Sequence, residues 1–328
     1  SNRGIELQLN AWLIETKDFS LNATFNIGHN KNKIDKLASG EKEWILTSAW
    51  RNDVVNSDDY RAYVGGTSGL IYGYVNDGFY TVADFESFDS KSRTWKLKDG
   101  VVDSSPLSDT PRPGNAKFKK LTPVDPNSTN PYQLTEADRT IIGNTTPKFS
   151  GGFGLNATYK GFDMSMFFNF MYDFDVLNAN KIMLTTWADN KENNFLMDIA
   201  SDKRWRNFDD MGNEIRYSPE ILAEFNKNAT MWNPTSIGRP ICMSYAVEDG
   251  SFLRLNSATL GYTLPSVWTK KVGLSKVRFY VSGNNLFTLT GYSGYDPEVN
   301  IATGLTPNID YDRYPRSRTY TFGAQLTF

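Results

Sequence analysis

The chain has 328 residues, of which 39% are hydrophobic and 22% are charged, and its 35 Lys and Arg nearly balance its 37 Asp and Glu. The net charge of −2 argues against a nucleic-acid-binding protein, and no run of about 18 apolar residues could form a transmembrane helix. The aromatic content is nevertheless high, since 14% of the residues are Phe, Tyr or Trp while the mean hydropathy is only −0.48.

The sequence begins with a predicted β-hairpin. Residues 5–13 and 19–27 alternate between apolar and polar side chains and are separated by a short polar turn at 15–18. Alternation of period 2 predicts strands with one apolar face. The long segment that follows holds further candidate strands within Tyr60–Phe85 and Arg93–Lys120.

A second hairpin is predicted near the middle of the chain. Residues 153–159 and 162–170 repeat the alternation on either side of a tight turn at Lys160-Gly161. Two helices are then predicted at Phe195–Trp205 and Ser218–Ala229, the second because Ser218-Pro219-Glu220 is a helix-start signal.

Three more strands are predicted towards the end of the chain, at 252–262, 277–281 and 320–328. Within the first of them the apolar parity slips at Asn256-Ser257. One extra residue in a strand has this effect, so we predict a β-bulge there.

Seven strands are therefore clear, and any others within 28–150 must come as an even number, so we expect seven or nine. Short turns alternate with long loops, which is typical of a transmembrane β-barrel whose long loops face outside. The long loops are 28–150, 171–250 and 288–318. A single-chain bacterial barrel has an even number of strands, so an odd count predicts that this chain is the C-terminal part of a larger barrel. We therefore predict an all-β fold, an antiparallel transmembrane β-barrel portion with long extracellular loops carrying short helices.

Cysteine and histidine each occur once, at Cys242 and His29. An intrachain disulfide is therefore impossible, and these two residues alone cannot complete a zinc site. No Walker A, dinucleotide-binding or G-x-S-x-G motif is present. We expect Cys242 to be a small buried hydrophobe, and we expect no catalytic residues.

Several further motifs follow one another along essentially the whole chain. They are Asn2–Leu7, Asp138–Phe149 with Gly151–Phe153, Tyr159–Asp163, Ser251–Leu255 with Thr259–Pro265, Gly283–Phe287, Gly294–Glu298 and Pro315–Gly323. In kind and in order, these motifs resemble those of the SusC/RagA family of TonB-dependent outer-membrane transporters.

The resemblance implies a large barrel in the bacterial outer membrane, closed by an N-terminal plug and covered by a SusD-like surface lipoprotein. It also implies import of oligosaccharides or oligopeptides, driven by the TonB complex through the plug. Residues 1–328 are then the C-terminal portion of the barrel, and the plug domain and N-terminal strands lie outside them. Residues 122–130 lack the D-x-[DN]-x-[DN]-G spacing of a calcium loop, so we expect neither a metal nor a cofactor.

Aromatic and arginine side chains are the candidate contacts to cargo, because aromatic faces stack on sugar rings and peptide side chains alike. Arg254, Arg278 and Tyr280 face the lumen if Leu253 and Val277 face lipid. The full candidate set is Trp187, Trp205, Trp232, Arg254, Arg278, Tyr280, Tyr292 and Tyr295. For the loop aromatics, the alternative is packing within the loops or contact with the SusD-like lipoprotein that covers the barrel. For the strand residues, the alternative is a solvated polar network on the lumen side of the barrel wall.

The last strand carries alternating apolar residues that resemble the signal for insertion of outer-membrane barrels. They are Tyr320, Phe322, Leu326 and Phe328. The alternative is a strand that simply ends on an apolar residue.

Two other functions remain open at this point. A surface glycan-binding β module would bury its apolar faces in a sandwich core. A glycan hydrolase would need two converging carboxylates; the adjacent pairs Asp58-Asp59 and Asp209-Asp210 are expected to point apart instead. We favour a transporter over an enzyme.

Overall fold

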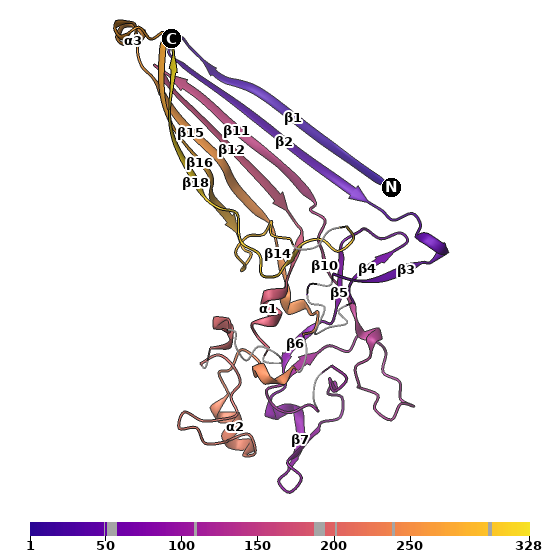
Figure 1. The fold of residues 1–328 in the computed structure, drawn as a ribbon. Helices are drawn as coiled ribbons and strands as arrows, with labels where there is room; N and C mark the ends of the chain where they lie inside the picture. Colours follow the sequence, from indigo (N-terminus) through magenta and orange to yellow (C-terminus); the bar gives the residue numbers. More distant parts are fainter. Residues whose placement is uncertain are drawn as a thin grey trace.

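The computed structural model describes residues 1–48, 50, 58–107, 110–186, 194–200, 202–237, 240–300 and 304–328. A curved sheet of long strands forms one part of the molecule, and a mass of shorter elements lies at one end of that sheet (Figure 1). Among the described residues, no helix combines the length and the apolar character that a membrane crossing needs.

Seven antiparallel strands form the main sheet. In spatial order they are β1 (Asn2–Glu15), β2 (Phe19–Asn32), β11 (Phe149–Tyr159), β12 (Phe162–Tyr172), β15 (Phe252–Thr263), β16 (Lys276–Thr290) and β18 (Thr319–Thr327). All seven strands predicted from the alternation are confirmed. Several are longer than predicted, since β1 and β2 each have 14 residues.

The turns and irregularities of the sheet also follow the sequence. Lys160 and Gly161 both have positive φ, 44° and 93°, as a two-residue hairpin of type I′ requires. The predicted bulge is confirmed, because the pairing of β15 with β12 skips Asn256. The connection from β15 to β16 contains a short helix, α3 (Ser266–Thr269), and a 3₁₀ turn at Lys270–Val272, which the sequence did not predict.

The candidate strands of the first long loop exist but lie outside the main sheet. Strands of the first long loop form three small sheets of their own, and a fourth small sheet joins strands of the second and third long loops. The members are β3 (Glu43–Thr47), β4 (Asp58–Tyr63), β5 (Leu70–Gly73) and β10 (Thr140–Asn144); β6 (Asn76–Phe79) and β9 (Ala116–Phe118); β7 (Phe85–Asp89) and β8 (Thr94–Leu97); and β13 (Asp175–Asn178), β14 (Val247–Asp249) and β17 (Ile309–Asp310). They are too short to cross a bilayer, which takes about 9–11 residues, so the main sheet has seven strands.

Helices in the loops are short. The predicted helix at Ser218–Ala229 is confirmed as α2 (Pro219–Phe225), and α1 (Ala179–Met183) was not predicted. The predicted helix at Phe195–Trp205 is wrong, because the described residues of this range contain a 3₁₀ turn at Met197–Ile199 and no α-helix. At the end of this range Arg204 forms a β-bridge with Met231, and the Trp205 backbone N–H donates to Met231 O. The 3₁₀ turns of the loops are Ala38–Gly40, Val82–Asp84, Glu136–Asp138, Met197–Ile199, Pro234–Ser236 and Ser244–Ala246.

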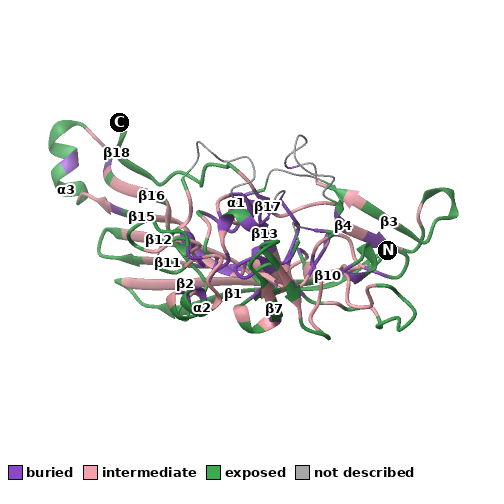
Figure 2. Cartoon of the chain, turned by 90° about the horizontal axis from the view of Figure 1, so that it is seen from below, coloured by how far each residue is buried: buried purple, intermediate pink, exposed green. Residues whose placement is uncertain are grey.

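The hydrophobic core of the chain lies in the loops. Figure 2 shows buried residues concentrated there, while the strands of the main sheet are mostly half-buried or exposed. One cluster joins Tyr60 of the first loop, Ile182 of the second and Ile309 of the third, and includes Cys242, which is buried as predicted. Another cluster joins Phe118 to Trp232. The described residues of 33–148, 173–251 and 291–318 therefore form one folded unit, here called the loop domain.

Candidate functional site

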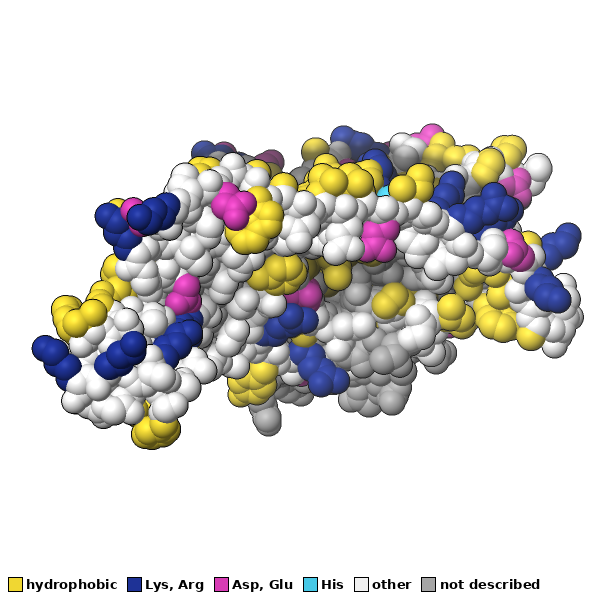
Figure 3. Space-filling model, turned by 90° about the horizontal axis from the view of Figure 1, so that it is seen from above, with side chains coloured by type: hydrophobic (Ala, Val, Ile, Leu, Met, Phe, Trp, Pro, Cys, Tyr) yellow, Lys and Arg dark blue, Asp and Glu magenta, His cyan; other side chains and the backbone are white. Residues whose placement is uncertain are grey.

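One face of the main sheet is apolar, and most of its side chains are exposed or half-buried, although Leu255 and Val277 are buried. The strand register places aromatic residues of neighbouring strands opposite one another, and all residues of such a row lie on this face. One row is Phe19, Tyr159, Phe162, Tyr262 and Phe279; the row nearer the loop domain is Phe25, Phe153, Phe168, Leu255 and Phe287. Phe162 and Phe279 are 50% and 51% exposed. Viewed from the short-turn end, hydrophobic side chains form exposed patches between scattered Lys and Arg (Figure 3).

The height of this apolar face matches a lipid bilayer. β11 runs from Phe149 to Tyr159, which is about 34 Å along the strand at a rise of about 3.4 Å per residue. At a tilt of about 40° this becomes about 26 Å along the barrel axis, close to the apolar band of about 25 Å in outer-membrane barrels. A sandwich core would require a second sheet against this face, and the described residues contain none there.

The opposite face of the sheet is polar and holds two of the candidate residues. Arg278 Nε donates to Asp163 Oδ1 at 2.9 Å, and the Arg278 guanidinium lies 5.1 Å from the Tyr280 ring centroid. Gly261 makes room for this pair, since a Cβ there would lie 2.4 Å from Arg278 Nη2. Gly323 does the same under the Tyr280 ring. Arg278 and Tyr280 thus occupy the face expected to line the lumen, and whether they contact cargo stays a prediction.

Arg254 lies in a buried ion-pair network at the loop end of β15. Its guanidinium is bidentate to Asp296 at 2.5 and 3.2 Å, and Arg254 Nε lies 3.0 Å from Glu298 Oε2. Burial alone would raise the pKa of Asp296, but hydrogen bonds from Arg254 and the Glu298 backbone hold it below its usual value. Arg316 lies 3.3 Å from Glu298 at the edge of the network. With Arg254 only 2% exposed, the network anchors the third long loop to the barrel and gives cargo no access to this guanidinium.

The loop aromatics that were candidates for cargo contact fall into two groups. Trp205 and Trp232 are each 2% exposed inside the loop-domain core, where Trp232 Nε1 donates to Thr185 O at 3.2 Å. Tyr292 is 6% exposed and its hydroxyl donates to Asp310. Their placement agrees with the alternative of loop packing. Tyr295 is open to solvent, and Trp187 lies outside the described residues.

The candidate assembly residues lie on the last strand and beyond it. Tyr320, Phe322 and Leu326 are all exposed on β18, and Phe328 follows the strand. Phe322 pairs with Val281, on the apolar face. Within the described residues β18 pairs only with β16 and β1 only with β2, so the sheet has two open edges.

The paired acids do not converge. Asp59 is buried and accepts from the Ser48 backbone at 2.7 Å, whereas Asp58 lies 3.9 Å from Arg139. Burial raises the pKa of Asp59 to about 6. Asp209 and Asp210 likewise have separate partners, Asn213 and Arg206. Among the described residues, no group of three or more His, Cys, Asp or Glu is placed to hold a metal ion.

Asp138, in the Asp138–Phe149 motif, is an anchor whose role the sequence did not reveal. Its carboxylate accepts from the backbone N–H groups of Leu121, Thr122 and Thr135 at 2.9, 2.7 and 2.8 Å. Burial alone would raise the pKa of Asp138, but these bonds and the Thr122 hydroxyl hold it well below its usual value. Arg139 stacks on Tyr72, 4.5 Å from the ring centroid.

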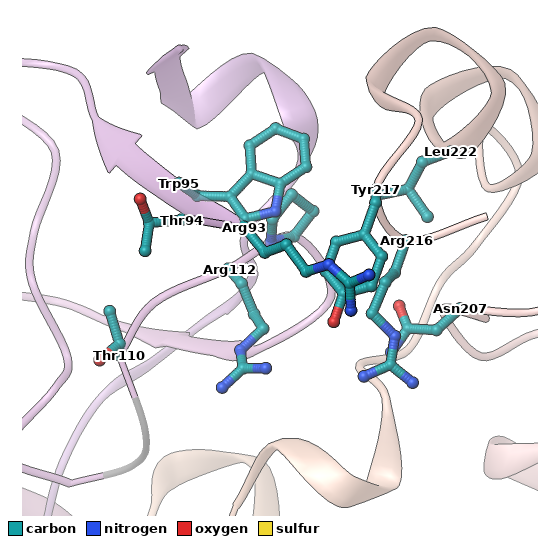
Figure 4. A pocket seen from close by; sticks show the side chains of 10 residues that line it. Arg93, Thr94, Trp95, Thr110, Arg112, Asn207, Arg216, Tyr217 and Leu222 are labelled. Atoms are coloured by element: carbon teal, nitrogen blue, oxygen red, sulfur yellow. The ribbon is translucent and has the colours of Figure 1, made fainter. Parts of the chain in front are cut away.

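The loop domain also contains a cavity that no sequence motif signalled. It lies between the β7–β8 hairpin and α2, at the end of the loop domain farthest from the main sheet (Figure 1). Its volume is about 200 Å³, and Arg93, Arg112 and Arg216 line it. In Figure 4 the Arg93 guanidinium lies beside Tyr217, and the guanidinium groups of Arg112 and Arg216 point in a common direction. Its other lining residues are Thr94, Trp95, Thr110, Pro113, Asn207 and Leu222.

Comparison with known proteins places the whole chain within longer relatives. No family model matches it. The chain is 32% identical over its full length to TonB-dependent receptor P3 of Formosa agariphila, and 25% identical to TonB-dependent receptor SusC of Bacteroides thetaiotaomicron. It covers 28% and 26% of these two proteins.

Solved structures show the same relation. The whole chain superposes on the RagAB peptide transporter with a TM-score of 0.65 at 22% identity, and on its "closed-closed" state with a TM-score of 0.64. In each case the match covers 29% of the solved chain. The chain therefore spans less than a third of the relatives that it matches.

Proposed function

Because this chain is related over its full length to the TonB-dependent receptors, SusC among them, and has the fold of the RagAB transporter, we propose that it is the C-terminal barrel portion of a SusC-like importer. The importer lies in the bacterial outer membrane and takes up oligosaccharides or oligopeptides. The relationship is to receptors and transporters rather than to enzymes. The SusC/RagA resemblance of the sequence motifs is thus confirmed.

The observation that carries the proposal is the apolar face of the main sheet. Its height of about 26 Å suits a bilayer, and the polar side chains Asp163, Arg278 and Tyr280 lie on the opposite face. An aqueous lumen lined by polar groups and an exterior facing lipid require this division.

The two open edges of the sheet support its completion by further strands. β1 is exposed along its whole length, and a long exposed edge is a site for strand pairing. We propose that the remaining strands of the same transporter pair with β1 and β18. The plug and the contact with TonB lie outside these residues in this proposal.

The loop domain is the proposed outer face of the transporter. The three long loops extend from the same end of the strands and share buried cores, so they form a folded surface. A SusD-like lipoprotein is its proposed partner. The short turns and α3 lie at the opposite, periplasmic end in this arrangement (Figure 1).

The test uses the complete transporter produced with its lipoprotein partner in outer membranes. We expect the protein to resist alkaline extraction and to need detergent for solubility, and cells lacking it to lose uptake of one class of oligomer. Uptake assays with matched oligosaccharide and oligopeptide mixtures separate the two cargo classes. A protein that stays in solution without detergent as a monodisperse monomer would overturn the proposal.

A further inference from the structure

We propose that the cavity between the β7–β8 hairpin and α2, here called the arginine pocket, binds an anionic sugar unit of an acidic oligosaccharide. The site deepens the proposed function, on which it rests for its biological role, by naming a class of cargo. It lies on the outermost part of the loop domain, away from the polar face of the barrel (Figure 1).

The charge of the pocket lining points to an anion. Arg93, Arg112 and Arg216 line it, and Glu214, which pairs with Arg216, is not among its described lining residues. Guanidinium groups form paired, charge-assisted hydrogen bonds with carboxylates and with oxyanions of similar geometry. Three of them around one opening of about 200 Å³ therefore favour a carboxylate or sulfate group.

Two of the arginines are held in place before any ligand arrives. The Arg93 guanidinium lies 4.7 Å from the Tyr217 ring centroid, and that ring stacks on Phe88. Arg216 Nε lies 2.6 Å from Glu214, and its guanidinium lies 5.4 Å from the Phe208 ring centroid. Figure 4 shows the terminal nitrogens of Arg216 pointing in the same direction as those of Arg112. Fixed donors lower the ordering cost of binding.

The neutral lining favours a sugar over an acidic peptide side chain. Thr94, Thr110 and Asn207 offer hydroxyl and amide groups that suit the hydroxyls of a pyranose, and Trp95 offers an aromatic face. The volume is below the range of about 300–1,000 Å³ that is usual for drug-sized ligands. It therefore suits a single unit of a longer molecule.

A second basic cavity continues the site and suits a chain of such units. This cavity has a volume of about 530 Å³ and shares Asn207 and Arg216 with the arginine pocket. Arg204 and Arg206 also line it, although Arg206 pairs with Asp210 at 2.7 Å. Asp209 lines it as well, and its carboxylate already accepts from Asn213. One sugar in the arginine pocket can thus be followed by the next beside these arginines.

The experiment measures binding to the complete, purified transporter with its partner by isothermal titration calorimetry. The probes are a tetragalacturonate, a neutral maltotetraose and a tetraglutamate peptide. The variant R93Q removes one guanidinium, and its matched control K91Q removes a charge two residues away, from an exposed side chain outside the pocket. We expect R93Q to weaken tetragalacturonate binding about 10-fold and K91Q to leave it within about 2-fold.

The outcomes separate the site from the transport proposal. We expect tetragalacturonate to bind more tightly than both other probes and to bind more weakly as salt is raised. Equal binding to R93Q and the parent protein, no binding of tetragalacturonate, or tighter binding of tetraglutamate would each overturn the site. R93Q-sensitive binding in a protein that imports no oligomer would support the site and count against the proposed transport.

Discussion

Removing Arg254 should release the third long loop from the barrel. Asp296 is 4% exposed and pairs with Arg254, while Glu298 lies 3.0 Å from the same guanidinium. Removal of one partner of a buried ion pair costs about 3–5 kcal/mol, because the remaining charges stay buried and unpaired. R254M leaves two carboxylates there, and the half-exposed Arg316 pairs with one of them.

Hydrogen exchange of the complete transporter, followed by mass spectrometry on peptides from 291–300, measures this loss. A local destabilisation of about 3 kcal/mol corresponds to at least about 100-fold faster exchange through opening. R61M is the matched control, since Arg61 pairs with the exposed Glu43 and such pairs contribute about 0–1 kcal/mol. Its effect on exchange near β4 should be at most about 5-fold.

A second variant tests the cause of the change. D296N in the R254M background removes one of the uncompensated charges, so it should recover part of the lost protection. Equal exchange in R254M and R61M, each measured around its own site, would refute the reasoning. It would mean that the third loop is held by its apolar contacts rather than by the ion pairs.

Three further predictions concern the apolar face and two buried carboxylates. M166R places a charge near the middle of the apolar face and should cost about 2–4 kcal/mol, against about 0–1 for Y159R at its edge; reversible unfolding in lipid vesicles measures both. The Asp59 pKa is raised to about 6, so the folded state holds a proton that the unfolded state releases above about pH 4. Stability should therefore fall between about pH 4 and 6, and D59N should flatten this part of a thermal-melting profile. Asp138 has the opposite sign, since its lowered pKa stabilises the loop domain above about pH 4 and this contribution disappears as the pH falls further. Exchange at Leu121 and Thr122 should rise in acid in the parent protein, and D138A should show raised exchange already at pH 7.

Local patterns in the sequence predicted the barrel strands well. The parity of 153–159 and 162–170, and the Lys160-Gly161 turn between them, depend on neighbouring residues only. The parity slip marked the bulge at Asn256 for the same reason. The prediction of a helix at Phe195–Trp205 was wrong, because a contact with Met231, distant in the sequence, outweighs local helix preference.

The sequence by itself therefore determined the seven strands and their apolar face, because a strand side chain's direction is set by its position along the chain. Its motifs also determined the family resemblance. Only the tertiary structure decided which loop aromatics are buried, since Trp232 is covered by segments from two different loops. It also brought Arg93, Arg112 and Arg216 to one cavity from three separate segments. No local sequence pattern predicts such long-range contacts, because they depend on how whole loops pack against one another.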